Sequence, residues 1–269
     1  MIDFPNAKIN LGLNIVGKRP DGYHNIQSCF FPAAWSDVLE IVPAARFAFS
    51  SSGIDIPGEP DTNLVVKAWQ LLHSEFGIDP VKMHLHKLVP IGAGLGGGSA
   101  DGAFALKMLN TLFKLGLTDQ KLQALAGQMG SDCPFFIKNE PAYVTGTGHI
   151  FSAIDLSLKG KWLVLLYPGI HISTAEAYRG IQPRPPQYNT LAVLQGPVTH
   201  WKEQLVNDFE EPLAKKYPRL RQLKQFFYEK GAFYAAMTGS GSAVYGIFNE
   251  ETRLQAPEGT TCWQGRLAR

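Results

Sequence analysis

The sequence has little cysteine, no long apolar run and almost no excess of charge of either sign. Its three cysteines, Cys29, Cys133 and Cys262, form no CxxC pair, which argues against a zinc site or a disulfide framework. The longest apolar run, Trp162–Tyr167, is far shorter than the ~20 residues that a membrane helix needs. The first residues show neither a basic segment nor a long apolar stretch, so we expect no secretory signal. These absences predict a cytoplasmic protein with no membrane partner.

The nearly balanced charge argues against one class of binding partner, nucleic acid. The 269 residues include 25 Lys and Arg against 23 Asp and Glu, a formal net charge of +2. A protein that wraps nucleic acid normally shows a clustered basic excess, so we expect no nucleic-acid partner. With 45% hydrophobic residues the chain can bury a large core, and its length fits one large domain or two small ones. Mixed strands and helices suggest α+β layers, with a seam between residues 152 and 160.

Periodicity in the sequence places the expected elements. Residues 7–16 alternate between apolar positions and a polar face that carries Lys8, Asn10 and Asn14, which is typical of a half-buried strand. Further strands are expected at residues 26–31, 38–42, 81–89, 135–137, 162–167 and at both ends of 232–248. Helices are expected at residues 64–76, 103–114, 118–129 and over most of 213–229.

Glycine is abundant, and its placement is informative. Of 27 glycines, six fall between Gly92 and Gly102, and no three-residue repeat suggests a collagen-like chain. The order strand, glycine loop, helix brings backbone N–H groups to an anion at the positive end of the helix. A tight turn that only needs positive φ would require one or two glycines rather than six. The segment therefore predicts a phosphate-binding loop.

The residues around this loop discriminate between phosphate-binding folds. Gly92, Gly94 and Gly97 satisfy GxGxxG, but the preceding strand carries four Lys or His residues, unlike the apolar central strand of a dinucleotide-binding fold. Gly98 is followed by Ser99, without the Lys that a Walker A loop requires. The HRD and DFG motifs of protein kinases do not occur.

Several segments together resemble the GHMP kinase superfamily, which includes galactokinase and the homoserine, mevalonate and phosphomevalonate kinases. The similar segments are residues 8–14 for its first motif, Pro90–Ala100 for its phosphate loop and Met237–Ala243 for its C-terminal glycine motif. Within the superfamily, residues 6–11, Arg19–His24 and Gly130–Phe136 resemble the kinases of a CDP-linked methylerythritol. Three motifs in this order cover most of the chain and are more specific than any one of them.

The resemblance implies a fold and an activity. It implies a two-domain α+β fold, with a ribosomal protein S5 domain 2-like, ATP-binding domain over residues 1–155 and a ferredoxin-like domain over residues 156–269. The implied activity is ATP- and Mg2+-dependent phosphorylation of a hydroxyl on CDP-linked methylerythritol, in the non-mevalonate isoprenoid pathway, by a monomer or homodimer.

The resemblance also implies roles for individual residues. Lys8 and Asp132 match its catalytic positions, and Ser99 a metal position. The implied ATP contacts are Asn63, Lys87, Pro90, Gly92, Gly94, Leu95, Gly96, Gly97, Gly98 and Ser99. The implied substrate contacts are Asn10, Tyr23, His24, Tyr178, Thr238, Gly239 and Ser240.

Spacing alone leaves simpler roles open for these residues. Lys8 could be a solvent-exposed lysine, and Asp132 a connector residue that bonds its own backbone. Ser99 could serve as the N-cap of the helix, as phosphate or metal contact, or as both. Tyr23 and His24 could anchor a loop, or an aromatic face could stack on a cytosine.

The sequence departs from the family pattern at two positions, and it leaves three other functions to consider. Ala100 stands where the family usually has a second serine, and His149 where relatives more often carry an acidic residue. Another GHMP kinase, such as a homoserine kinase, is the nearest alternative function. A non-catalytic sensor of a phosphate ligand and a dinucleotide oxidoreductase are the others.

Overall fold

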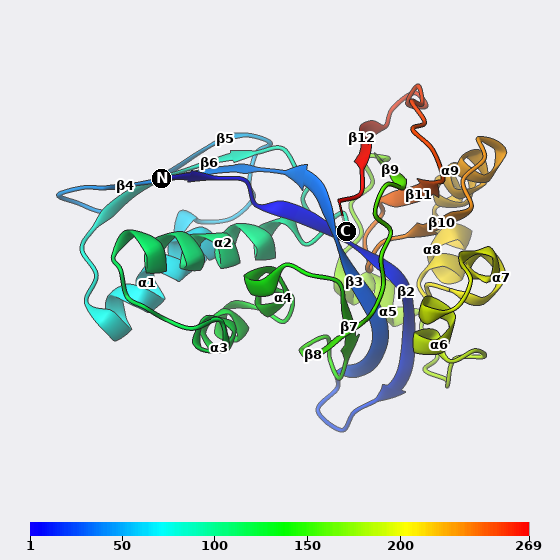
Figure 1. Cartoon of the computed structure of the whole chain (residues 1–269), viewed down its shortest axis with the longest axis horizontal. Helices are drawn as coiled ribbons and strands as arrows, with labels where there is room; N and C mark the ends of the chain where they lie inside the picture. Colours follow the sequence, from blue (N-terminus) through cyan, green and yellow to red (C-terminus); the bar gives the residue numbers. More distant parts are fainter. Residues whose placement is uncertain (269) are drawn as a thin grey trace. The chain divides into compact units, whose positions relative to one another are not determined.

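The computed structural model describes residues 1–268, which form two compact units of interleaved segments (Figure 1). Unit 1 comprises Met1–Ala7, Trp35–Ile91 and Gly96–Glu140. Unit 2 comprises Lys8–Ala34, Gly92–Leu95 and the residues from Pro141 onward. Because both units are assembled from separate segments, they define no single boundary along the chain. The division expected at residues 155/156 therefore stays a prediction.

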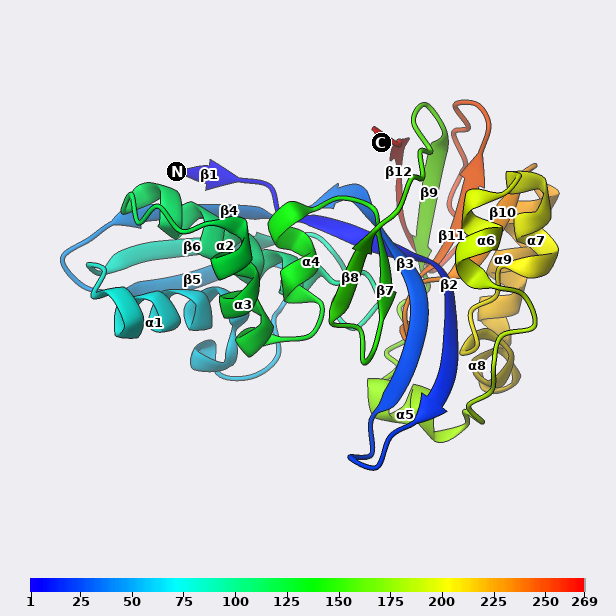
Figure 2. The same cartoon turned by 60° about the horizontal axis from the view of Figure 1, so that its bottom comes forward.

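Unit 1 is a four-stranded sheet with helices packed on one side (Figures 1 and 2). Its strands, in spatial order, are β1 (Ile2–Asp3), β4 (Val38–Pro43), β6 (Val81–Lys87) and β5 (Ala48–Gly53). Strands β5 and β6 are parallel, and the other pairs are antiparallel. Its helices are the 3-10 turn η1 (Pro60–Thr62), α1 (Leu64–Phe76), α2 (Gly97–Leu112), α3 (Asp119–Met129) and α4 (Cys133–Lys138).

Local signals in the sequence explain where the helices of unit 1 begin. The side chain of Asn63 accepts a hydrogen bond from the N–H of Val65 and caps α1, and Thr118 caps α3 through the N–H of Lys121. Both helices coincide with the expected ones. Helix α2 begins six residues earlier than expected, at Gly97, so the glycines extend into the helix itself.

The segment expected to be a strand at residues 135–137 is instead part of helix α4. A short, fully buried apolar run does not distinguish strand from helix by periodicity. Pro134 in the first turn favours the helix because its missing N–H has no intrahelical partner there in any case. Residues 213–229 are mostly helical, as expected, and they belong to two helices that meet at Tyr217, where Pro218 begins the second.

Unit 2 contains two antiparallel sheets. In spatial order, the first has β2 (Asn6–Lys18), β3 (His24–Ser36), β7 (Ala142–Thr145) and β8 (Ile150–Ala153), and the second has β10 (Tyr234–Met237), β11 (Val244–Phe248), β9 (Trp162–Tyr167) and β12 (Thr261–Arg266). Its helices are α5 (Thr174–Arg179), α6 (Thr190–Gln195), η2 (Val198–His200), α7 (Trp201–Gln204), α8 (Glu210–Lys216) and α9 (Pro218–Glu229).

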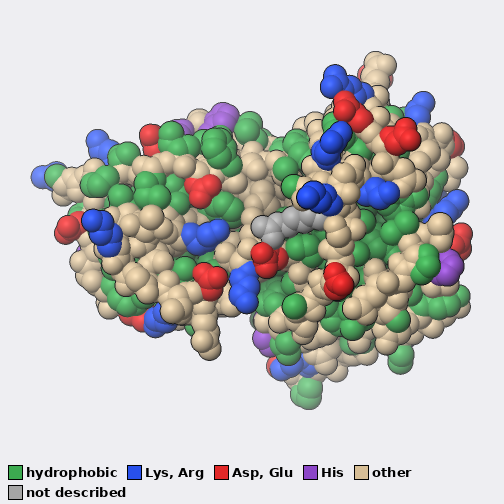
Figure 3. All heavy atoms as spheres, in the orientation of Figure 1, with side chains coloured by type: hydrophobic (Ala, Val, Ile, Leu, Met, Phe, Trp, Pro, Cys, Tyr) green, Lys and Arg blue, Asp and Glu red, His purple; other side chains and the backbone are tan. Residues whose placement is uncertain are grey.

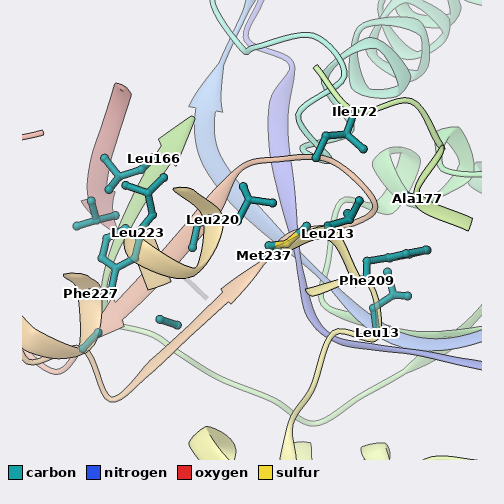
Figure 4. Packing of buried hydrophobic residues seen from close by; sticks show 14 of the residues in the cluster. Leu13, Leu166, Ile172, Ala177, Phe209, Leu213, Leu220, Leu223, Phe227 and Met237 are labelled. Atoms are coloured by element: carbon teal, nitrogen blue, oxygen red, sulfur yellow. The ribbon is translucent and has the colours of Figure 1, made fainter. Parts of the chain in front are cut away.

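The apolar core of unit 2 joins the second sheet to strand β2 and to helices α8 and α9 (Figure 4). Leu13 of β2 and Leu166 of β9 contribute to the same buried cluster as Leu223 and Phe227 of α9. Burial of such a cluster is the main stabilising contribution to a domain of this kind. Both units therefore have the expected α+β character.

The described residues contain no helix that is long and apolar enough to cross a membrane. On the face drawn in Figure 3, basic and acidic side chains are interspersed over both units, in keeping with the net charge of +2.

Candidate active site

Strand β2 buries polar side chains in unit 2, among them those of Lys8 and Asn10. They are 3% and 1% exposed, so Lys8 is not the solvent-exposed lysine that spacing left open. The Lys8 ammonium donates to Asn10 Oδ1 at 2.5 Å and to the carbonyl oxygen of Gly94 at 3.2 Å, and it lies 4.6 Å from the centre of the Phe30 ring. These contacts fix the position of the buried ammonium beside the glycine loop within unit 2.

The first motif, part of the glycine loop and the C-terminal glycine motif meet in unit 2. Thr238 Oγ1 accepts from the Asn10 N–H at 3.1 Å and lies 3.1 Å from the Gly94 carbonyl oxygen, to which it can donate. The Lys8 N–H donates to the carbonyl oxygen of Leu95 at 2.8 Å. Thr238 is fully buried, although it and Asn10 are 228 residues apart. The structure thus joins three motifs that the sequence analysis could only place in order.

Close packing of two loops explains why glycines are needed here. A Cβ on Gly94 would lie 1.9 Å from the carbonyl oxygen of Thr238, and a Cβ on Gly241 would lie 2.1 Å from the carbonyl carbon of Ala93. Gly94 and Gly239 also have positive φ, +83° and +59°. Glycines that the sequence analysis assigned to a phosphate cradle are therefore required first by contact between the two loops.

The C-terminal glycine motif has further support from its own unit. Asn207 Nδ2 donates to the carbonyl oxygens of Met237 and Gly239, both at 3.0 Å. Ser240 is half-buried, with its hydroxyl 3.5 Å from that of Thr174. Asn207 was missed by the sequence analysis, because no motif marks an amide that acts through backbone carbonyls.

The second half of the glycine loop belongs to unit 1 and opens helix α2. Gly96, with φ +71°, is the N-cap, so Ser99 lies inside the first turn and is not the cap. The first N–H groups of a helix have no intrahelical acceptor, and they carry its partial positive charge. A Cβ on Gly98 would meet nothing within 4 Å, so this side of the turn is open to an anion. Gly92, near the other end of the loop, has positive φ and faces His171 within unit 2.

Asp132 is half-buried at the junction of α3 and α4 in unit 1. Its carboxylate accepts from the Ser131 hydroxyl at 3.5 Å. The next residue, Cys133, is buried, and a side-chain hydrogen bond joins its thiol to Ser99. Burial raises the pKa of the Cys133 thiol to about 11, with Asp132 acting in the same direction and Ser99 against it. The segment around Asp132 is thereby tied to the first turn of α2.

The donor set of unit 1 is compatible with Mg2+. The described residues contain no group of three His, Cys, Asp or Glu side chains that could hold a metal by themselves. Mg2+ in phosphoryl-transfer enzymes is normally held by one or two protein oxygens together with phosphate oxygens and water. The Ser99 hydroxyl, in the first turn of α2, is an oxygen of the type that such sites use.

Two residues implied as ATP contacts have their side chains engaged in the structure. Asn63 caps α1 through its Oδ1. Lys87 is 3% exposed, and its ammonium pairs with Asp37 and with Asp101, the latter at 2.8 Å. Pro90 is buried between Lys87 and the glycines. Their part in binding ATP stays a prediction.

The two carboxylates beside Lys87 were missed by the sequence analysis. Burial affects the pKa values of both the acidic and the basic groups of this cluster. Burial raises the pKa of Asp101 to about 7, and the nearby Lys87 acts in the opposite direction. Burial acts to lower the pKa of Lys87, but the carboxylates of Asp101 and Asp37 outweigh it and the pKa is raised. A sequence signal existed, because Lys87 is in phase with the buried positions of β6 and needs acidic partners there.

His24, the first residue of β3, forms an aromatic pair with Tyr178 of helix α5 in unit 2. The His24 ring stacks on Tyr178 at 4.8 Å between centroids, and Tyr178 meets Phe209 edge-on at 4.9 Å. The loop residue before His24, Tyr23, is 67% exposed, so it does not act as a buried anchor. The structure therefore brings His24 and Tyr178 together and leaves the Tyr23 side chain exposed to solvent.

Comparison with known proteins agrees with this arrangement. The model of the GHMP kinases N-terminal domain matches residues 63–140, and that of the GHMP kinases C-terminal domain matches residues 198–258. A 4-diphosphocytidyl-2-C-methyl-D-erythritol kinase of Bacteroides fragilis is 50% identical over 99% of this chain and its own full length. The chain belongs to this kinase family. A Cytophaga hutchinsonii member is also 50% identical, over 93% of each chain.

Solved structures agree with the family and its fold. A crystal structure of a 4-(cytidine 5'-diphospho)-2C-methyl-D-erythritol kinase has a TM-score of 0.81 and 28% identity over both complete chains. A Methanococcus jannaschii mevalonate kinase has a TM-score of 0.72 at 15% identity, covering 100% of this chain and 98% of its own, which shows the shared GHMP fold alone. Membership of the GHMP kinases makes the chain an ATP-dependent kinase. The predicted fold class and family are confirmed.

Proposed function

We propose that the protein transfers the terminal phosphoryl group of ATP to the 2-hydroxyl of 4-diphosphocytidyl-2-C-methyl-D-erythritol, a step of the non-mevalonate route to isoprenoid precursors. The observation that carries the proposal is the 50% identity, over the full length, with a relative named for this kinase activity. The clustering of Lys8, Asn10 and Thr238 with the glycine loop supports it from the geometry of unit 2.

Two side chains are proposed to act on the acceptor hydroxyl. Asp132 accepts or orients the hydroxyl proton, and Lys8 holds that hydroxyl and offsets the negative charge that develops during transfer. Because the transition state of phosphoryl transfer is loose, positioning contributes more than the strength of the base.

The nucleotide is proposed to lie against the first turn of α2. The N–H groups of Gly97 and Gly98 bind phosphate oxygens, and the open side of Gly98 allows their close approach. Ser99 is the residue that would hold Mg2+ here, and the bound ion would offset charge on the phosphates. With a net charge of only +2, backbone N–H groups and a few placed cations do the anion binding.

The cytidine is proposed to be recognised by Tyr23, His24 and Tyr178. An aromatic face can stack on a nucleobase, and the His24 ring nitrogens can bond its edge. The His24–Tyr178 stack supports this assignment, because it presets the orientation of both rings. Gly239 and Ser240, beside the buried Thr238, complete the proposed substrate contacts.

The test is ADP release from Mg-ATP with 4-diphosphocytidyl-2-C-methyl-D-erythritol, with homoserine and mevalonate as control acceptors. We expect turnover with the first acceptor alone and competition by CDP. Turnover with homoserine that CDP does not inhibit would assign the chain to another GHMP kinase activity, and no ADP release with any acceptor would favour a phosphate-ligand sensor. Cytoplasmic location and the choice between monomer and homodimer stay predictions.

A further inference from the structure

Unit 1 buries two carboxylates and one ammonium side by side, at the ends of the glycine loop. Asp37, Lys87 and Asp101 are 0%, 3% and 2% exposed, and the Lys87 ammonium bonds to both carboxylates. Lys87 is the last residue of β6, and Asp101 lies in the second turn of α2. The loop from Leu88 to Gly96 thus begins and ends at this cluster.

Asp37 also holds the first residues of the loop directly. Its Oδ1 accepts hydrogen bonds from the N–H groups of Leu88 at 2.6 Å and Val89 at 2.8 Å, while its Oδ2 binds Lys87. Its own N–H donates to the carbonyl oxygen of Pro5. One carboxylate therefore fixes the path of the chain from strand β6 into the loop.

The first turn of α2 is shaped to admit the ammonium. A Cβ on Gly97 would lie 2.9 Å from Lys87 Nζ, so the bare Cα leaves room for the lysine beneath the turn. A cation near a helix N-terminus is repelled by the helix dipole. The two carboxylates offset that repulsion and hold the ammonium there.

Stability alone does not account for this cluster. A buried ion pair is often no more stabilising than apolar side chains of similar volume, because both charges lose their hydration. Asp101 Oδ1 has no hydrogen-bond partner among residues 1–268, and a partly satisfied buried network is a further cost. What the cluster does provide is a fixed distance between the end of β6 and the start of α2.

We infer that Asp37 is a positioning residue for ATP, which holds Lys87 and the entry of the glycine loop so that the N–H groups of the α2 first turn meet the phosphates. The inference rests on the proposed nucleotide site at α2. It does not depend on which alcohol accepts the phosphoryl group.

The experiment measures ATP affinity by calorimetry without acceptor, together with the KM of the acceptor, in Asp37→Ala and Asp37→Asn. The asparagine keeps an oxygen for the N–H groups of Leu88 and Val89 but removes the charge. We expect the dissociation constant for ATP to rise about tenfold in Asp37→Ala and less in Asp37→Asn. The acceptor KM should change less than twofold in both variants.

Two control variants separate positioning from loss of fold. Leu72→Ala removes a buried side chain of α1 and should lower Tm without changing ATP affinity. Glu75→Gln removes the carboxylate of the exposed ion pair with Lys121 and should change neither. Unchanged ATP affinity in both Asp37 variants would overturn the inference, as would equal losses in ATP and acceptor binding. The two claims fail on different readouts. Absence of turnover with any acceptor in the parent protein would refute the proposed function, whereas the ATP affinities of the Asp37 variants decide the inference.

Discussion

The carbonyl oxygen of Thr238 occupies the space that a side chain on Gly94 would need. A Cβ there would lie only 1.9 Å from that oxygen, and Gly94 has φ +83°. Thr238 in turn bonds to the N–H of Asn10 on the strand that carries Lys8. The buried lysine, the glycine loop and the C-terminal glycine motif are therefore held in one arrangement by backbone contact.

Gly94→Ala should damage unit 2 as a whole. Positive φ and a backbone clash together should destabilise the protein by about 2–4 kcal/mol, because neither loop can move without breaking the hydrogen bonds of Thr238. We expect a lower Tm in calorimetry and loss of kcat, without a specific change in either KM.

Gly98→Ala is the matched control and should have the opposite effect on stability. Its Cβ would meet nothing within 4 Å, and alanine favours a helix by roughly 0.5–1 kcal/mol over glycine. Tm should stay equal or rise while the KM for ATP rises, because the new methyl group covers the proposed phosphate side of the turn. A lower KM for ATP would contradict this assignment.

Asp132→Asn should retain ATP binding and lose most turnover. The amide keeps the size of the side chain but removes its ability to accept the hydroxyl proton, a loss of roughly 10²–10⁴-fold in kcat. Single-turnover kinetics and ATP calorimetry measure the two effects separately. Ser131→Ala, at the adjacent hydroxyl, should change kcat little. If Asp132→Asn stays within a few-fold of the parent, Asp132 is not the base.

Removing either ring of the His24–Tyr178 stack should weaken the cytidine substrate and spare ATP. Stacking on a base contributes about 1–3 kcal/mol, so Tyr178→Leu should raise the substrate KM roughly 5- to 150-fold. Tyr188→Leu, at an exposed tyrosine of the same unit, is the control. Steady-state kinetics with each substrate varied in turn would measure this, and equal rises in both KM values would argue for a general loss of structure.

Thiol reagents should distinguish the three cysteines. Burial raises the pKa of Cys29 to about 12 and of Cys133 to about 11, so both remain protonated and covered at pH 8. Cys262 is half-buried, and it should react first in the native protein. Because the folded state binds more thiol protons above the ordinary thiol pKa of 9.0, these two groups should lower stability as pH rises from 9 towards 12. Mass spectrometry after alkylation, with and without denaturant, would locate the modified thiols.

The sequence predicted best those helices and strands whose type and bounds depend on residues within or next to the element itself. Alternation predicted the strand β2, and Asn63 and Thr118 mark the starts of α1 and α3 through their own side chains. The expectation that β2 is half-buried was wrong, because residues 7–15 are buried on both faces and the polar positions of the alternation are covered as well. The strand predicted at residues 135–137, which is part of helix α4, was wrong because three successive buried residues show no periodicity. The glycines of the loop looked equivalent in sequence, yet Gly94 serves loop packing and Gly98 faces open space, a difference set by residues far along the chain.

The candidate site also contains residues that the sequence indicated and residues that only the structure revealed. The resemblance indicated Lys8 and Asp132, but the partners that fix their surroundings, such as Thr238 and Cys133, became evident only from contacts. The cluster around Lys87 could have been anticipated in part. Position 87 continues the buried alternation of β6, and a lysine there requires carboxylates, although sequence does not say which.

The interleaving of the two units has a consequence for the order in which the protein is made. Every segment of unit 1 has been synthesised once Glu140 is added, whereas Asn10 must wait 228 residues for Thr238. At a synthesis rate of about 5–20 residues per second, that delay is roughly 11–46 s. The buried surroundings of Lys8, which Asn10 and Thr238 complete, therefore form well after Lys8 itself is made.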